Sequence, residues 1–178
     1  MWVIPVTIAP GPTEIQHLEL AMKKGINLLG PGLDGLDILV QSVVAEWQSA
    51  QKLPQDTNRS LEEQYEELAR DTKDGPVVLY LHGGAYIVGS PDTHRALTLN
   101  IAKGCNGRIF CVKYRLSPEY PFPAALIDAL TAYMYLIDPP KNAFHQAIHP
   151  SKIIIAGDSA GVGETHCQSD SRAASRSL

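Results

Sequence analysis

A serine flanked by glycines lies late in the sequence, directly after an apolar run. The run covers residues 152–156, and the Gly-x-Ser-x-Gly motif covers residues 157–161 with Ser159 at its centre. This order is typical of a buried strand that enters a sharp turn, and the glycines leave room for a strained backbone at the serine. Such a turn lifts the hydroxyl above the edge of a sheet, where a base can reach it. Ser159 is therefore a candidate nucleophile.

A second glycine motif, at residues 82–86, directly follows the apolar run at 77–81. Adjacent glycines let backbone N–H groups point into a cavity, and such donors stabilise an oxyanion; losing one costs on the order of 10²–10³ in rate. Alone, this motif fits a tight turn without function equally well. Together, at the ends of neighbouring strands, the two motifs predict Ser159 as the nucleophile. The predicted oxyanion donors are the N–H groups of Gly83, Gly84 and Ala160.

Alternating strands and helices must position these motifs. Strands are predicted at 77–81, 108–114 and 152–156, and helices at 91–102 and 123–137. Continuous apolar strands in a βαβ series indicate a parallel sheet with helices on both faces. Sites in such sheets form at the carboxyl ends of the strands, where both glycine motifs lie. In the first helix, Leu97 and Ile101 are expected to face inward, with Gly104 as its stop.

The N-terminal part of the chain carries weaker signals. A capping box of Thr13 with Gln16, followed by apolar residues at helical spacing, predicts a helix that either packs on the core or forms part of a lid. Residues 36–47 fit a helix or a strand, because a short apolar run does not settle the period. Ser60 with Glu63 forms a second capping box and opens another predicted helix.

Composition excludes several classes of function. The chain has 178 residues, 44% hydrophobic and 19% charged, which indicates one folded domain, or one domain with pieces missing. A net charge of −4 without a basic run argues against a nucleic-acid partner. No histidine or cysteine has the spacing of a metal site, and Cys105, Cys111 and Cys167 are interpreted as free thiols.

The N-terminal segment is apolar but short. Residues 1–8 have no positive n-region and are interrupted by Pro5, which argues against a signal peptide. No apolar run reaches the ~18 residues that a membrane span needs. A cytoplasmic protein without a transmembrane segment is the default interpretation, with the compartment otherwise open and with the possibility that upstream sequence is absent.

Three stretches resemble the hormone-sensitive-lipase-like esterases and lipases of the α/β-hydrolase fold. They are residues 82–86, 114–125 and the Gly-Asp-Ser-Ala-Gly form of 157–161, within a continuous match over 77–161. Residues 1–76 match loosely and are expected to hold helices of a cap and an early core segment, with 40–47 as a strand. By this resemblance, the protein hydrolyses carboxylic esters of short or medium acyl chains, from small molecules or lipids, without cofactor or metal.

The resemblance also implies a mechanism and residue roles. A base removes the proton of Ser159 as its oxygen attacks the ester carbonyl, the oxyanion hole holds the intermediate, and water cleaves the acyl-enzyme. Tyr86 is expected to line the acyl pocket. Four further motif residues are expected to be structural: His82, Gly157, Asp158 and Gly161.

The residues after the serine motif depart from the family pattern. In α/β-hydrolases the acid and base follow the nucleophile well downstream, but residues 162–178 are polar and have no apolar stripe. His166 and Asp170 lie four residues apart and within eleven residues of Ser159, which does not fit a triad. We therefore interpret 162–178 as an aberrant tail, expected to be disordered, on an α/β core that lacks the last strands, the acid and the base.

Two hypotheses follow. The chain is an impaired serine ester hydrolase, or it is a non-catalytic truncated product that is unstable or binds and regulates a partner. An open edge at the strand before Ser159 predicts self-association. A nucleotide-binding βαβ protein is disfavoured, because no Gly-x-Gly-x-x-Gly follows a strand.

Overall fold

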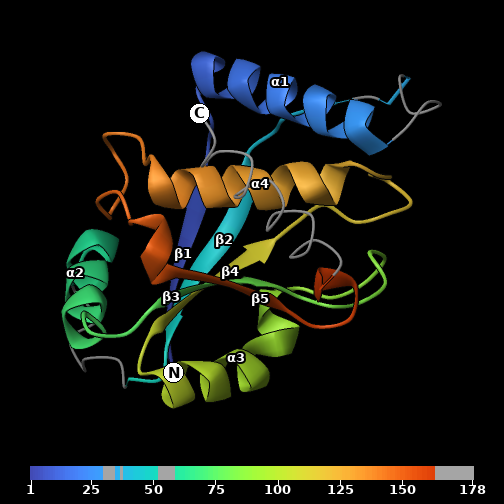
Figure 1. Ribbon diagram of the computed structural model, residues 1–178. Coiled ribbons are helices and arrows are strands. Elements are labelled where there is room, and N and C mark those ends of the chain that lie inside the picture. Colours follow the sequence, from blue (N-terminus) through green and yellow to red (C-terminus); the bar gives the residue numbers. More distant parts are fainter. Residues whose placement is uncertain (30–34, 37, 52–58, 163–178) are drawn as a thin grey trace.

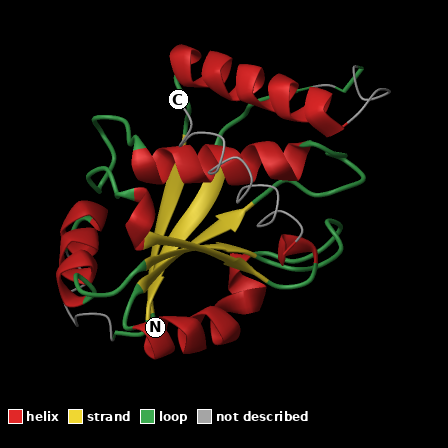
Figure 2. Ribbon diagram, in the orientation of Figure 1, coloured by secondary structure: helices red, strands yellow, loops and turns green. Residues whose placement is uncertain are grey.

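Five strands form a sheet in the computed structural model, which describes residues 1–29, 35–36, 38–51 and 59–162. Figures 1 and 2 show the sheet between layers of helix. The strands, in spatial order, are β1 (Trp2–Ile8), β2 (Val43–Ser49), β4 (Arg108–Lys113), β3 (Val77–Leu81) and β5 (Ile153–Gly157).

The sheet is mostly parallel, as predicted. β3 pairs in parallel with both β4 and β5, whereas β2 runs antiparallel to β1 and β4. β2 is therefore the one reversed strand among the five described. Because Leu81 is the register partner of Gly157, the carboxyl ends of β3 and β5 lie side by side. The two glycine motifs thus emerge at the same edge of the sheet.

Helices cover both faces of the sheet. α4 (Ala124–Ile137) lies against one face and α3 (Pro91–Cys105) against the other (Figure 1). α1 (Pro12–Leu29) packs on the outer side of α4, away from the sheet, where Leu18 and Met22 meet Ile127. α2 (Leu61–Asp71) begins at the predicted capping box, since Ser60 accepts from the Glu63 N–H and the Glu63 side chain accepts from the Ser60 N–H.

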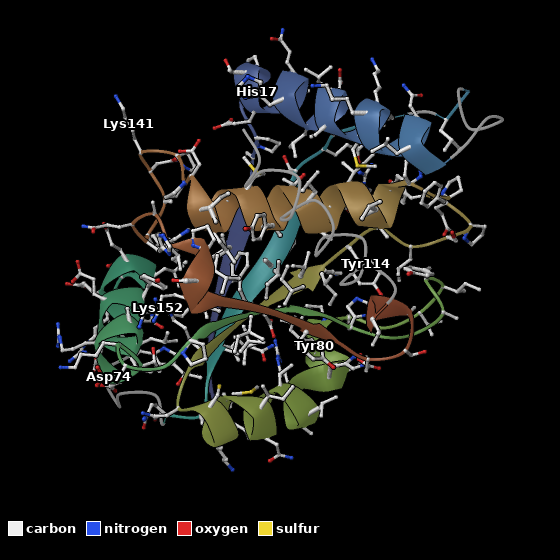
Figure 3. All side chains as sticks on the ribbon, in the orientation of Figure 1. His17, Asp74, Tyr80, Tyr114, Lys141 and Lys152 are labelled. Carbon is white, nitrogen blue, oxygen red and sulfur yellow. The ribbon has the colours of Figure 1, made fainter. Side chains whose placement is uncertain are left out.

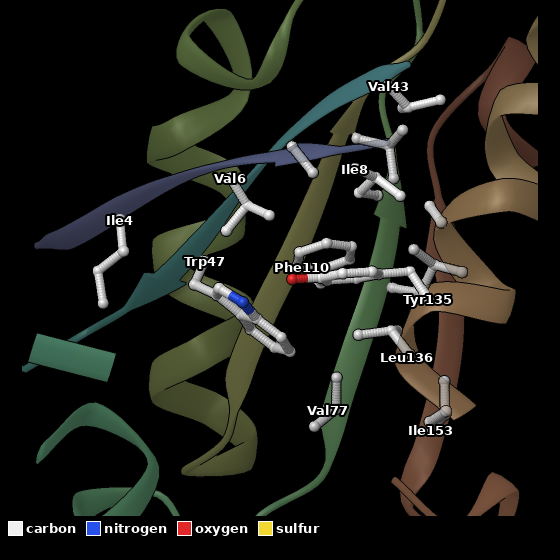
Figure 4. Packing of buried hydrophobic residues seen from close by; sticks show 14 of the residues in the cluster. Ile4, Val6, Ile8, Val43, Trp47, Val77, Phe110, Tyr135, Leu136 and Ile153 are labelled. Carbon is white, nitrogen blue, oxygen red and sulfur yellow. The ribbon is translucent and has the colours of Figure 1, made fainter. Parts of the chain in front are cut away.

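Large aromatic side chains fill the core between α4 and the sheet. Trp47 of β2 lies 4.5 Å from Phe110 of β4, and Phe110 lies 5.8 Å from Tyr135 of α4, measured between ring centroids. Figure 4 shows these rings with the surrounding aliphatic side chains of β1, β2 and β3. Truncating one such ring to alanine typically costs about 3–5 kcal/mol of stability. The packing of these rings therefore stabilises the strands from which the loops of the candidate site emerge.

β1 was not predicted from the sequence. Its side chains alternate between buried and more exposed positions, and Pro5 lies within it. Proline is tolerated there because β1 is an edge strand of the described sheet, where an N–H is not required on both sides. Of the two alternatives for residues 36–47, the strand is confirmed, although β2 spans 43–49 and therefore begins and ends later than that range.

Three local predictions about helices are wrong. α1 begins at Pro12, because Gly11 supplies the first helical carbonyl, to the N–H of Ile15; Thr13 is therefore not its N-cap. Leu97 of α3 is 44% exposed, since Thr98 and Ala102 form the buried face. α3 also runs past Gly104 to Cys105.

The stop of α3 comes from Asn106, whose φ of 48° is left-handed and whose N–H bonds to Ala102. Asparagine tolerates this conformation almost as glycine does.

Within the described ranges, no helix combines the length and the apolar character that crossing a bilayer requires.

Candidate active site

The elbow after β5 holds Ser159 in a left-handed backbone conformation, with a φ of 49°. A non-glycine residue at positive φ is strained by about 1–3 kcal/mol and persists only where its surroundings hold it. Here the N–H of Gly161 bonds to the carbonyl of Asp158 at 2.9 Å, and a Cβ at 161 would collide with the carbonyl of Leu81. The elbow is therefore packed tightly against the end of β3, with Ser159 exposed.

The turn after β3 is also left-handed over three consecutive residues. φ is 125° at Gly84, 55° at Ala85 and 62° at Tyr86. The carbonyl of Gly84 accepts from the N–H groups of residues 87 and 88, at 2.9 and 3.0 Å. Among the described residues, no acceptor bonds to the N–H of Gly84 or of Ala160. These two donors remain available at the shared edge.

Asp158 joins the two loops. Its Oδ1 accepts from the Tyr80 hydroxyl at 2.7 Å and from the Gly83 N–H at 2.9 Å, and it lies 3.5 Å from Nε2 of His94. Burial raises the pKa of Asp158, but the hydrogen bonds from Tyr80 and Gly83 and the nearby imidazoles outweigh it, so that the pKa lies below its ordinary value. Asp158 is thus an ionised anchor, and the Gly83 N–H is engaged by its carboxylate.

His82 is enclosed beneath the glycine turn after β3. Its ring stacks on Tyr114 with 4.2 Å between centroids, and the Tyr114 hydroxyl donates to the His82 carbonyl. Burial is the main cause that lowers the pKa of His82, so the ring is neutral near pH 7. Its Nδ1 lies 2.8 Å from the Gly83 carbonyl, while its buried Nε2 has no partner in the described part of the chain. This geometry fits the structural role predicted for His82.

Tyr86 links the turn to the elbow from the other side. Its hydroxyl donates to the carbonyl of Ala160 at 2.7 Å. Together with Asp158, this bond holds the two loops at a set separation. The expected role of Tyr86 in an acyl pocket stays a prediction.

Sequence reasoning missed the residues that support the loops from below. Tyr80, two residues before the turn, lies on the α3 side of the sheet, whereas Tyr114 packs with the cluster on the α4 side (Figure 3). His94, in the first turn of α3, stacks on His82 with 5.4 Å between ring centroids. The sequence could have indicated Tyr80, because it is a tyrosine in an apolar strand and buried tyrosine hydroxyls usually have a hydrogen-bond partner. Nothing local pointed to His94.

Arg115 lies in the loop after β4. Its guanidinium forms an ion pair of 2.7 Å with Asp128 of α4. Asp128 also accepts from the Arg115 N–H at 2.7 Å. This buried pair ties the loop after β4 to α4.

Several sequence interpretations lie outside the described residues. They are the interpretation of the tail from residue 163 onward and the individual predictions for His166, Cys167 and Asp170. Among the residues that the structure does describe, no three histidine, cysteine, aspartate or glutamate side chains are grouped to hold a metal ion.

Comparison with known proteins identifies the family. A model described as the alpha/beta hydrolase fold matches residues 78–169, about half of the chain. The chain belongs to the α/β-hydrolase fold family. The match spans β3, β4, β5 and both glycine motifs, so the predicted resemblance and fold class are confirmed.

The named relatives that the chain resembles include hydrolases, esterases and lipases. An acetyl-hydrolase of Streptomyces hygroscopicus is 42% identical over 91 residues, which are 51% of this chain and 28% of the relative. An ethyl acetate hydrolase of Pseudomonas putida is 38% identical over 104 residues, 58% of this chain and 32% of the relative. The chain thus spans about 30% of the length of these relatives.

A solved structure extends the similarity beyond the motifs. The crystal structure of EstE5 soaked with p-nitrophenyl butyrate is 28% identical, with a TM-score of 0.52, and the match covers 87% of this chain and 50% of that one. The larger coverage includes elements before residue 78, which the family model does not match.

Proposed function

We propose that this chain carries the nucleophile and oxyanion half of a serine carboxylic ester hydrolase, with Ser159 as the nucleophile. One observation carries the proposal: Ser159 sits in a strained, exposed elbow at the carboxyl end of β5, beside the N–H groups of Gly84 and Ala160, which have no acceptor among the described residues. Strained backbone conformations cluster at functional sites, and an elbow of this kind presents its serine hydroxyl above the carboxyl end of the sheet.

In the proposed reaction, a base accepts the hydroxyl proton of Ser159 as Oγ forms a bond to the ester carbonyl carbon. The carbonyl oxygen becomes an oxyanion that accepts from the N–H groups of Gly84 and Ala160. The C–O bond to the alcohol then breaks, the alcohol takes up the proton, and water hydrolyses the acyl-enzyme. Gly83, the third predicted donor, would first have to release Asp158, so we assign it a positioning role.

We propose esters of short acyl chains as the substrate class. The support is that the relatives are named for acetyl and ethyl acetate hydrolysis and that EstE5 was soaked with a butyrate ester. Lipid esters are the wider alternative.

The test is phosphonate labelling of the intact 178-residue chain together with turnover of p-nitrophenyl butyrate. Labelling is expected to be lost completely in Ser159→Ala and to be unchanged in the control Ser42→Ala, an exposed serine ahead of β2. If the label goes elsewhere or survives in Ser159→Ala, Ser159 is not the nucleophile.

A non-catalytic role is the second candidate, and the histidines of the described residues favour it. His82 is buried on Tyr114, and His94 lies against Asp158. Within the described residues, no histidine bonds to the hydroxyl of Ser159. This candidate predicts at most slow phosphonate labelling and no Ser159-dependent turnover in a chain that unfolds cooperatively. Turnover lost in Ser159→Ala would contradict it.

We also propose that the chain associates with itself through β5. β5 is an edge strand of the described sheet, and its Ile154 is 50% exposed. Exposed apolar edge strands pair with other chains. Ile154→Lys is expected to shift the chain toward monomer in size-exclusion chromatography with light scattering. A monomer in both forms would contradict the proposal.

A further inference from the structure

A cavity lies at the amino ends of the parallel strands, opposite the carboxyl ends where Ser159 lies. It has a volume of about 600 Å³ and lies between α2, the first residues of β3 and β4, and the loop that leads into β5. Since β3 spans five residues at roughly 3.3 Å each, this cavity lies roughly 15 Å from the elbow. It is therefore separate from the candidate active site.

The cavity gathers positive charge from several elements. Four cationic side chains line it, against a single carboxylate among the described lining residues, that of Glu66. The cations are Arg70 and Lys73 from the end of α2, Arg108 from the start of β4, and Lys152 ahead of β5. None of the four forms an ion pair within 4.0 Å with a carboxylate of the described ranges.

Helix electrostatics explain part of this arrangement. Cations at the C-terminus of a helix offset its negative end, which accounts for Arg70 and Lys73 beside the last turn of α2. Arg108 and Lys152 belong to other elements, and their approach to the same cavity adds like-charge repulsion. A bound anion would compensate this repulsion.

Arg108 is held ready for such a ligand. Its guanidinium lies 5.8 Å from the ring centroid of Trp47 and 6.0 Å from that of Tyr65. Its Nη1 donates to the Thr72 hydroxyl at 3.3 Å, while its buried Nε has no partner among the described residues. Packing against two rings restricts the rotamers of this side chain, so little entropy is lost when it binds an anion.

His145 also lines this cavity. It is 7% exposed, and its Nε2 lies 3.0 Å from the Tyr135 carbonyl, so Nε2 carries the proton. Its Nδ1 is then an unprotonated acceptor, and it has no partner within the described part of the chain. Hydrogen phosphate and phosphate monoesters offer anionic oxygens to the cations and, when singly protonated, an O–H to such a nitrogen. Sulfate lacks that O–H near neutral pH.

We infer that this cavity binds a small soluble phosphate-bearing anion, at a site distinct from Ser159. Arg108 and Lys152 hold the anionic oxygens, with Lys73 and Arg70 at the rim and His145 accepting the phosphate O–H. The inference does not depend on the proposed esterase activity.

The experiment is isothermal titration of the 178-residue chain with inorganic phosphate at pH 6.5, beside sulfate and chloride at equal ionic strength. One saturable phosphate site is expected, with sulfate binding more weakly. The double variant Lys73→Gln/Lys152→Gln removes two exposed cations without touching the core and should weaken phosphate binding about tenfold or more.

The matched control is Lys103→Gln/Lys141→Gln, which removes two exposed lysines outside the cavity and should leave phosphate affinity unchanged. Binding should also persist in Ser159→Ala. Equal weakening in both double variants, a response no larger than that to chloride, or binding to phosphatidate vesicles without binding of free phosphate would overturn the inference.

Discussion

The two edges of the sheet are built on different principles. At the carboxyl edge, backbone groups form the candidate site: consecutive left-handed residues, two N–H groups without an acceptor among the described residues, and an exposed serine, with Asp158 as a shared anchor. At the amino edge the polar groups belong to side chains, with Arg108 and His145 set among aromatic rings. The first edge should therefore be sensitive to sterics, and the second to charge and pH.

The steric side of this contrast is tested by Gly161→Val, with the largest expected effect. A Cβ at this position meets the carbonyl of Leu81, and neither backbone can move without disturbing β3 or the elbow. We expect a loss of more than about 3 kcal/mol in the free energy of unfolding, together with loss of phosphonate labelling. Chemical denaturation measures the first and mass spectrometry the second.

The control is Gly25→Ala in α1, where nothing lies within 4 Å of the added methyl group. It should stabilise the chain by up to about 1 kcal/mol, because alanine is the better helix former. If Gly161→Val were tolerated like Gly25→Ala, the elbow would not be sterically constrained.

The electrostatic side is tested by pH at His145. Burial, with a smaller contribution from Arg108, lowers the pKa of His145 to about 4 from 6.5. The unfolded chain therefore binds more protons than the folded one between these values, so stability is full above pH 6.5 and falls as the pH drops toward 4. The expected loss is up to about 3 kcal/mol. His145→Phe keeps a ring but does not titrate.

Thermal or urea unfolding from pH 7.5 to 4 measures this effect as the difference between the two proteins. The stability curve of His145→Phe should be flatter by the amount stated, since other groups titrate equally in both. Parallel curves would mean that His145 is not buried in its neutral form.

The smallest expected effect belongs to the anchor between the two loops. Asp158→Asn keeps the shape of the side chain but removes the charge that accepts from Tyr80 and Gly83. We expect about 1–2 kcal/mol lower stability and a severalfold slower labelling of Ser159, because the oxyanion turn is held less firmly. Labelling kinetics with Glu62→Gln, an exposed carboxylate of α2, serve as the reference. Equal rates in both variants would remove Asp158 from the site's support.

Local patterns were reliable where neighbouring residues decide the structure. The capping box at Ser60, the apolar runs of β3 and β5, and both glycine motifs depend on chemistry within a few residues, and all appear where expected. The predicted end of α3 at Gly104 was wrong, because Asn106, two residues later, adopts the left-handed conformation that ends the helix.

Long-range pairing decided the rest. β1 looked like an apolar terminus with a proline, and only its ladder with β2 makes it a strand. The bond between Asp158 and Gly83 joins residues 75 positions apart, so no local spacing shows that the Gly83 N–H already donates to a carboxylate.

The sequence by itself determined the family, the Gly-x-Ser-x-Gly elbow and the glycine turn after β3, because each of these depends on contiguous residues whose backbone conformations are set locally. Only the tertiary structure decided which N–H groups have no acceptor among the described residues, and that Tyr80 and His94 support Asp158. It also brought four cations from α2, β4 and the residues before β5 to one cavity. The physical reason is that these arrangements arise from strand order and helix packing, which bring together side chains that are distant in the chain.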